Sequence, residues 1–159
     1  MTERSELDAQ SYVLLRLEDR QFALPAKRIA ELVPLSRVFR FPHCSPEVEG
    51  VLIRRGRILA VCDISPRLAA RPLKNRRLYL LAVRDFAARP ESVAVPVTGE
   101  CELISAEMTP ATGGQPPHVR GWISHDGNVI EVLDLDNLIP GPTAAPNAVQ
   151  AGVPQEALP

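Results

Sequence analysis

The sequence repeats itself at a spacing of 71 residues, and this repeat limits the possible folds more than any other feature does. The matches concentrate at prolines, glycines and turn aspartates: Ala23-Leu-Pro25 with Ala94-Val-Pro96, Pro46 with Pro117, Gly50 with Gly121, Gly56 with Gly127, and Asp63 with Asp134. These residue types set backbone geometry. The chain is therefore predicted to form two similar lobes of about 60–70 residues, each so small that they share a core.

Short aliphatic and β-branched runs between turn residues predict strands in both lobes. Hairpins are expected over residues 12–24, 51–61, 78–95 and 122–133, with Gly56 and Gly127 in two of the turns. Helical segments should be short, namely residues 26–33 and single turns capped by Asp63 and Asp134. We predict an all-β fold of two similar five-stranded β-barrel lobes packed together, with short helical turns, because curling a sheet hides its edges.

The folded part is expected to span residues 11–139. Residues 1–10 are polar and residues 140–159 contain five prolines without a hydrophobic period, so both segments are predicted to be disordered. The lobes are expected at about residues 21–76 and 92–139, with the first strand shared. No apolar signal region or membrane-length apolar run is visible, which predicts a cytoplasmic protein without direct membrane insertion.

Composition argues against several classes of function. With 18 basic and 19 acidic residues the net charge is −1, which disfavours a nucleic-acid partner. The cysteines Cys44, Cys62 and Cys101 are widely separated and predict neither a disulfide framework nor a zinc site. No phosphate-cradling glycine motif is present. We therefore expect no cofactor, no metal and no catalytic residues.

The arginine cluster Arg54-Arg-Gly-Arg57 is the best candidate for a functional surface. It could be a solvated hairpin turn, but a β-turn presents side chains rigidly and arginine is favoured at protein interfaces. Two catalytic alternatives are weaker. His43 and Cys44 could form a thiol–imidazole dyad, and Asp134 with Asp136 could form a carboxylate pair.

The segments Phe22-Ala-Leu-Pro25, Ile29-Ala-Glu31 and Val48 to Asp63, which includes Gly50-Val-Leu-Ile-Arg-Arg55-Gly56, resemble the CheW family. Val119-Arg-Gly121 and Val129 to Leu135 are similar to the closing strands of that family. The resemblance covers nearly all of residues 11–139 and implies two SH3-like five-stranded barrels packed side by side. The chain departs from the family pattern at Ile53, Arg54, Ala60 and Ser65-Pro66.

The resemblance implies a non-enzymatic adaptor that couples methyl-accepting chemoreceptors to a CheA-type histidine kinase. The expected partners are the CheW-like regulatory domain of the kinase and the cytoplasmic tip of the receptors, which would recruit the protein to membrane-bound arrays. Arg55 matches the family arginine implicated in this coupling, and Gly50, Ile29 and Glu31 match positions of a receptor-facing groove between the lobes. Arg54 and Gly56 complete the predicted partner-binding set.

The main alternative is a small redox or hydrolytic enzyme on a β-barrel scaffold that uses His43 and Cys44. A nucleic-acid binder on an SH3-like barrel is a third hypothesis. The sequence leaves the output pathway open, whether flagellar motility, pili, surface sensing or second-messenger production.

Overall fold

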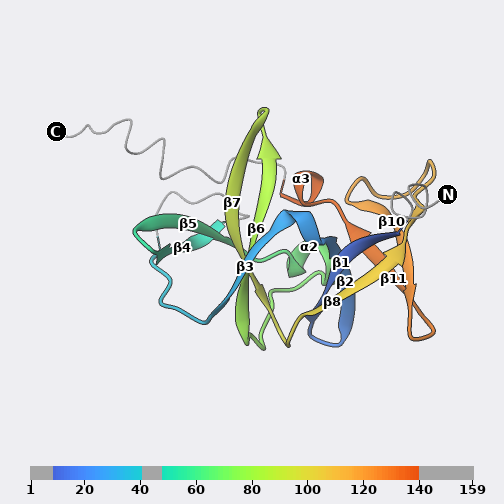
Figure 1. Cartoon of the computed structure of the whole chain (residues 1–159). Helices are drawn as coiled ribbons and strands as arrows, with labels where there is room; N and C mark the ends of the chain where they lie inside the picture. Colours follow the sequence, from blue (N-terminus) through green and yellow to red (C-terminus); the bar gives the residue numbers. More distant parts are fainter. Residues whose placement is uncertain (1–8, 41–47, 140–159) are drawn as a thin grey trace.

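The computed structural model describes residues 9–40 and 48–139. In these residues eleven strands form two sheets, and three further segments are short helices (Figure 1). The strands are β1 (Ala9–Leu17), β2 (Arg20–Pro25), β3 (Ile29–Pro34), β4 (Val48–Arg54), β5 (Arg57–Cys62), β6 (Leu78–Phe86), β7 (Arg89–Val97), β8 (Glu102–Glu107), β9 (Thr109–Pro110), β10 (Val119–His125) and β11 (Asn128–Leu133). The helical segments are η1 (Ala26–Arg28), α2 (Ser65–Ala69) and α3 (Leu135–Leu138).

The two sheets define two lobes. Lobe A has the strand order β8-β1-β2-β11-β10-β9, and lobe B has the order β3-β6-β7-β5-β4. The prediction of an all-β fold with two similar β-lobes and short helical turns is confirmed. The first residues of β1 are Ala9 and Gln10, which were expected to be disordered. Residues 1–8 and 140–159 lie outside the described residues.

The repeat is visible in the strands as well as in the sequence. The β4–β5 hairpin spans residues 48–62 and the β10–β11 hairpin spans residues 119–133, a shift of 71 at both ends. Each hairpin carries a register irregularity at its repeat glycine, Gly50 or Gly121. The parallel pairs are equivalent too, because Ala60 pairs with Val93 in lobe B and Glu131 pairs with Phe22 in lobe A.

The strand pairing divides the chain differently from the lobes expected at about residues 21–76 and 92–139. Lobe B takes residues 29–97, whereas lobe A combines the β1–β2 hairpin with β8 to β11. Each half of the repeat therefore gives strands to both lobes. A repeat identifies equivalent strands, but it does not identify the copy with which each strand pairs, because that choice depends on contacts between residues distant in the sequence.

Each lobe has its own apolar interior, and a larger cluster joins the two lobes. Val33, Leu52 and Leu81 belong to the interior of lobe B, while Leu14 and Ile130 belong to that of lobe A. The joining cluster draws on both sheets and on α3; it includes Leu15, Leu24, Leu80, Val95 and Leu135. Burying one such side chain stabilises the fold by about 1.5–3 kcal/mol. The shared core expected for lobes of this size is therefore present.

Two local predictions have different outcomes. Asp134 caps α3 as expected, because its carboxylate accepts a hydrogen bond from the Asp136 amide at 3.0 Å. Asp63 accepts a hydrogen bond from the Ser65 amide at 2.9 Å, but the N-cap residue of α2 is Ile64. The helix expected over residues 26–33 is wrong. It shrinks to the single turn η1, and the remaining residues pair with β6 as strand β3. Tertiary pairing here overrides a weak local helical preference.

The glycine of the second register irregularity provides a test of this packing. A Cβ atom at Gly121 would collide with the Thr109 carbonyl oxygen and would press on the Met108 side chain. We expect Gly121→Ala to lower the free energy of unfolding by about 1–3 kcal/mol, measured by urea denaturation. Gly113→Ala is the control, because a Cβ atom there meets nothing within 4 Å. Equal stabilities of the two variants would contradict the close approach of β9 to β10.

Candidate functional site

The β4–β5 hairpin ends in a turn that carries three arginines at one end of lobe B. Arg54 pairs with Arg57 across the hairpin, and Arg55 and Gly56 between them have φ values of 53° and 76°. Two successive positive φ values belong to a type I′ turn, which matches the twist of the flanking strands. The turn predicted around Gly56 is confirmed. We call Arg54, Arg55, Gly56 and Arg57 the arginine tip.

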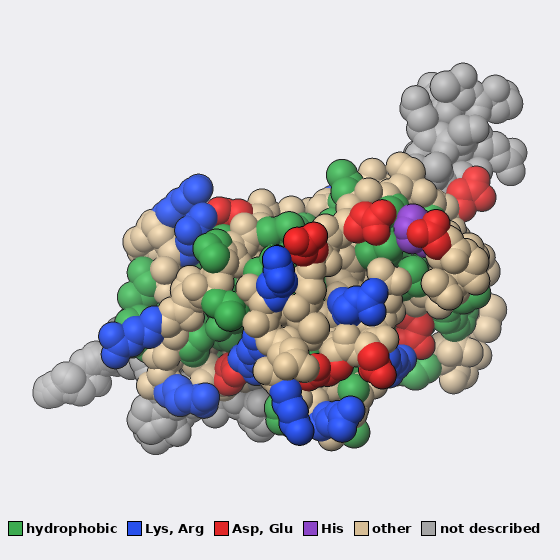
Figure 2. Space-filling view, turned by 90° about the horizontal axis from the view of Figure 1, so that it is seen from below, with side chains coloured by type: hydrophobic (Ala, Val, Ile, Leu, Met, Phe, Trp, Pro, Cys, Tyr) green, Lys and Arg blue, Asp and Glu red, His purple; other side chains and the backbone are tan. Residues whose placement is uncertain are grey.

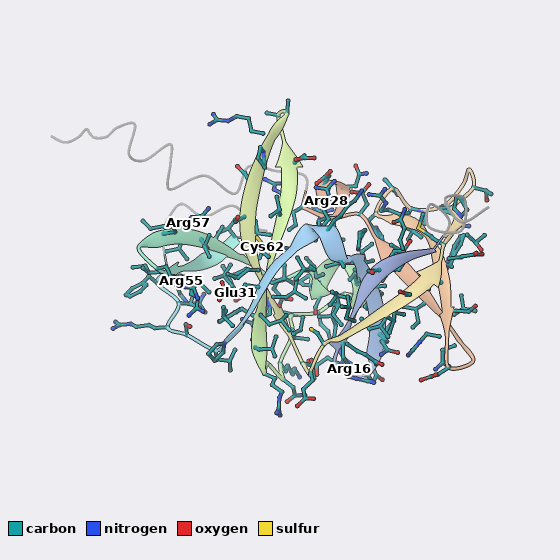
Figure 3. All side chains as sticks on the ribbon, viewed as in Figure 1. Arg16, Arg28, Glu31, Arg55, Arg57 and Cys62 are labelled. Carbon is teal, nitrogen blue, oxygen red and sulfur yellow. The ribbon has the colours of Figure 1, made fainter. Side chains whose placement is uncertain are left out.

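Glu31 of β3 is the acidic partner of this tip. Its Oε2 atom lies 2.5 Å from Nη2 of Arg54 and 3.5 Å from Nη2 of Arg55. Strands β3 and β4 are the two edges of the lobe B sheet, so this contact links them across the opening of the curled sheet. Figure 3 shows Arg55 and Arg57 on the hairpin, with Glu31 on its inner side. Glu31 thus restrains the side chains of Arg54 and Arg55.

The electrostatics of Glu31 follow from this geometry. The hydrogen bond from Arg54 is the main cause that lowers the pKa of the Glu31 carboxyl. Desolvation opposes it as the next largest effect, and the positive charges of Arg54 and Arg55 each lower the pKa by less. Glu31 is therefore a carboxylate at neutral pH. Arg55 keeps a side chain that is 74% exposed, so its guanidinium remains accessible to another molecule.

The other two predicted site residues lie apart from the tip and have packing contacts of their own. A Cβ atom at Gly50 would lie 2.6 Å from the Phe39 carbonyl oxygen, so the close approach of residues 38–39 to β4 requires glycine there. Ile29 is partly buried and packs against the core that joins the lobes. The structure thus brings together Glu31, Arg54, Arg55 and Gly56, and it places Gly50 and Ile29 elsewhere.

Exposed apolar side chains surround the tip. Ile53 and Ile58 form a cross-strand pair just before it and are 55% and 60% exposed. Leu32 follows Glu31 on β3, and the Arg37 guanidinium lies over the Phe39 ring. Arginine beside exposed aliphatic and aromatic groups is typical of protein–protein interfaces. The surface therefore has the composition of a protein-binding surface.

The sequence reasoning missed a second tip in lobe A. His125 and Asp126 occupy the repeat positions of Arg54 and Arg55, and Glu102 occupies that of Glu31. The His125 Nε2 atom lies 3.7 Å from the Glu102 carboxylate and 3.3 Å from the Asp126 carboxylate. The contact joins β8 to the β10–β11 hairpin, which are the repeat equivalents of β3 and the β4–β5 hairpin in lobe B. The 71-residue repeat was the available signal, since it aligns all three positions.

The catalytic alternatives gain no support from the described residues. His43 and Cys44 lie outside those residues. Burial raises the pKa of the Cys101 thiol to about 11, so it does not supply the thiolate that a redox enzyme needs. The Asp134 carboxylate is used to cap α3, and the Asp136 carboxylate binds Arg28 and the Asp85 amide.

Metal-binding clusters and membrane-spanning helices are also absent from residues 9–40 and 48–139. This part of the chain has no cluster of three or more histidine, cysteine or acidic side chains that could hold a metal. It also has no helix long and apolar enough to cross a membrane. Trp122 is half-buried and lines a shallow groove with residues of β8 to β11.

Two curled sheets packed on a shared core, with the repeat running across both, define a two-lobed β-barrel domain. The family model of the CheW-like domain matches residues 11–139. The chain therefore belongs to the CheW-like domain family.

Two named relatives support this assignment. The chain is 23% identical over 133 residues to "Chemotaxis protein CheW" of Rhizobium meliloti (strain 1021), a match that covers 80% of this chain and 86% of the relative. Its fold is similar to the crystal structure of the scaffolding protein TtCheW from Thermoanaerobacter tengcongensis, with a TM-score of 0.66 and 19% identity. That match covers 81% of this chain and 86% of the other.

The ion pair of the tip can be tested through the titration of Glu31. Replacing Arg54 by methionine should raise the pKa of the Glu31 carboxyl toward its ordinary value of about 4.3, because the hydrogen bond that favours the carboxylate is lost. The pKa is measured by NMR from the chemical shift of the carboxyl carbon. Arg57→Met is the control: it removes an equal charge from the same turn but leaves both contacts of Glu31 in place. Equal shifts in the two variants would contradict a specific Arg54–Glu31 bond.

The same pair should make stability depend on pH. A carboxyl whose pKa is lowered by folding adds stability that is complete above its unfolded pKa and disappears as pH falls through its folded pKa. We therefore expect Glu31→Gln to destabilise the protein at pH 7. The difference from wild type should begin to shrink as pH falls below about 4.3 and should vanish below the lowered pKa of folded Glu31. Urea denaturation across this pH range measures it. A difference that stays constant down to pH 3 would contradict the ionic contribution of Glu31.

Proposed function

We propose that this chain is a non-enzymatic adaptor that couples methyl-accepting chemoreceptors to a CheA-type histidine kinase in a chemosensory array. Its membership of the CheW-like domain family supports the adaptor role. The observation that carries the proposal is the arginine tip, where Glu31 orients Arg54 and Arg55 beside exposed aliphatic residues. Such a surface is prepared for protein contacts and contains no group activated for chemistry.

The partners that fit this surface have apolar patches bordered by carboxylates. Arg55 offers an exposed guanidinium that can form two parallel hydrogen bonds with a carboxylate. Ile53 and Ile58 offer apolar area next to it. A receptor's helical tip and the CheW-like regulatory domain of the kinase are the proposed partners. The receptors recruit the protein from the cytoplasm to the membrane-bound array, for flagellar or another output.

Gly50 and Ile29 enter the proposal indirectly. Gly50 allows residues 38–39 to lie close against β4, which places Phe39 and Arg37 near the hairpin. Ile29 anchors the start of β3 in the joining core and thereby helps to position Glu31 two residues later. Substituting either residue should therefore affect partner binding through the shape of lobe B.

Charge reversal at the exposed arginine tests this proposal. Partners are first identified by pull-down from the native cytoplasm, and the affinity of the purified chain for the kinase regulatory domain and a receptor tip is then measured by calorimetry. We expect Arg55→Asp to weaken binding at least about tenfold, which corresponds to about 1.4 kcal/mol. The melting temperature should remain near that of the wild type, because Asp126 occupies the equivalent backbone conformation in lobe A.

Arg89→Asp is the matched control. Arg89 is an exposed arginine next to another turn with positive φ, but it lies on the β6–β7 hairpin rather than on the arginine tip. This variant should bind as the wild type does. Unchanged binding of Arg55→Asp, or an equal loss in both variants, would contradict the role of the arginine tip.

A further inference from the structure

The lower face of the molecule in Figure 1 carries an excess of basic side chains, although the whole chain has a net charge of −1. Three connections meet on this face: the β1–β2 turn, the segment from α2 to β6, and the segment from β7 to β8. Figure 2 looks onto it and shows several basic side chains across its middle, with acidic ones between them. The exposed basic side chains of these connections and their flanking strands, which we call the basic face, are Arg16, Arg20, Arg67, Arg71, Lys74 and Arg77.

The rest of the chain does not share this excess of positive charge. Acidic side chains of the same region are Glu18, Asp19, Glu49, Asp63 and Glu100, and Arg76 lies between two of them. Seven basic groups against five acidic groups leave the region with a formal charge of +2. The other 11 of the 18 basic residues and 14 of the 19 acidic residues leave the remainder of the chain at −3.

One stretch of sequence supplies most of these charges. Residues 64–84 contain six basic residues and no acidic one. Two of the six are used inside the fold, because Arg76 binds two carboxylates and the buried Arg84 binds Glu91. The four others are exposed: Arg67, Arg71, Lys74 and Arg77. Folding therefore neutralises two of the basic residues and leaves four on one face.

Hydrogen bonds hold the backbone that carries Arg71 and Lys74, although this backbone lies outside the helices and strands. The Glu18 carboxylate accepts a hydrogen bond from the Lys74 amide at 2.7 Å, and the Asp63 carboxylate accepts one from the Leu73 amide at 2.8 Å. Glu18 belongs to the β1–β2 turn, so its bond ties lobe A to the segment between α2 and β6. A restrained backbone loses less entropy when a partner binds its side chains.

Arg71 and Lys74 lie at a shallow hollow of about 420 Å³, whose other lining residues are Glu18, Asp19, Asn75 and Thr98. Both basic side chains are exposed. Within residues 9–40 and 48–139, neither side chain makes a hydrogen bond or a salt bridge. The Glu18 carboxylate, in contrast, is bound to the Lys74 amide and to the Asn75 side chain. Two cations beside the hollow are therefore available to another molecule.

The residues around the hollow restrict the class of that molecule. In the described part of the chain, the β1–β2 turn and residues 65–77 hold no exposed large hydrophobic side chain. Proteins that lie on membranes insert apolar and aromatic side chains, and binders of single-stranded nucleic acids stack bases on aromatic rings. Arginine forms two parallel hydrogen bonds with a carboxylate. The composition of the face therefore favours an acidic protein segment.

We propose that the basic face binds a partner protein through a segment rich in aspartate and glutamate. Carboxylates of that segment pair with Arg71 and Lys74 at the hollow, and the surrounding arginines attract the segment over a longer range. The basic face lies apart from the arginine tip, which is at one end of lobe B (Figure 1). The inference goes beyond the proposed function, because it gives the chain a further contact that does not use the arginine tip.

Fluorescence anisotropy of the purified chain with a labelled peptide of about ten glutamates tests the contact; such a peptide is extended because its charges repel each other. The wild type should bind it with a Kd at or below about 1 mM. Binding should weaken when salt rises from about 0.1 M to about 1 M, since the Debye length then shortens from about 10 Å to about 3 Å. A glutamine peptide of the same length should not bind.

Two charge-matched double variants make the test specific. Replacing Arg71 and Lys74 by glutamine should weaken peptide binding at least about tenfold. The control replaces Lys27 and Arg89 by glutamine, which removes the same two charges from exposed side chains on η1 and the β6–β7 hairpin. The control should bind as the wild type does. Both variants should keep the wild-type melting temperature, since Glu18 binds the backbone amide of residue 74 and not its side chain.

The proposal is overturned if the wild type does not bind the glutamate peptide up to about 1 mM. It is also overturned if the two double variants lose equal affinity, because binding would then follow net charge alone. A DNA duplex, or vesicles of anionic lipid, bound as tightly as the peptide would overturn it too, because the face would then not select carboxylates. Receptor and kinase are absent from these measurements, so the proposed function can fail independently.

Discussion

The parallel pairing of β2 with β11 and of β5 with β7 is the constraint on which the rest of the structure depends. Each pairing joins a strand from one half of the repeat to a strand from the other half, so neither half can complete a lobe alone. This exchange brings both sheets against one apolar cluster, and that cluster supplies the core that lobes of this size lack. Because these contacts join residues far apart in the sequence, neither lobe can form before both halves of the chain are present.

This exchange of strands between the two halves of the repeat also places oriented polar side chains at one end of each lobe. In each lobe a polar contact joins two strands that are not paired with each other: Glu31 of β3 with Arg54 of β4 in lobe B, and Glu102 of β8 with His125 of β10 in lobe A. The contact holds the two strands near each other and also orients the side chains of the adjacent turn. Because the Arg54 and Glu31 side chains remain 34% and 29% exposed, the solvent screens their ion pair and it stabilises the protein by little. Its larger effect is to reduce the side-chain entropy lost when a partner binds.

The proposed adaptor role needs only contacts of modest strength. Two similar lobes with different side chains at their ends present two different surfaces on one small chain. Several weak contacts in an assembly give strong binding overall, because each contact after the first forms within the same assembly. A change at one contact can then shift the arrangement of the others without a chemical step.

The sequence by itself determined the class of fold, the repeat, the turns and the arginine cluster. These features depend on residues close together in the chain: Gly56 and Gly127 favour positive φ, Asp134 caps the turn that follows it, and short aliphatic runs form strands. The tertiary structure alone decided which half of the repeat pairs with which, and it turned residues 29–34 from an expected helix into edge strand β3. It also decided that Glu31 meets Arg54 while Gly50 and Ile29 serve packing. The physical reason is that edge pairing and side-chain contacts join residues far apart in the chain, where local propensity carries no information.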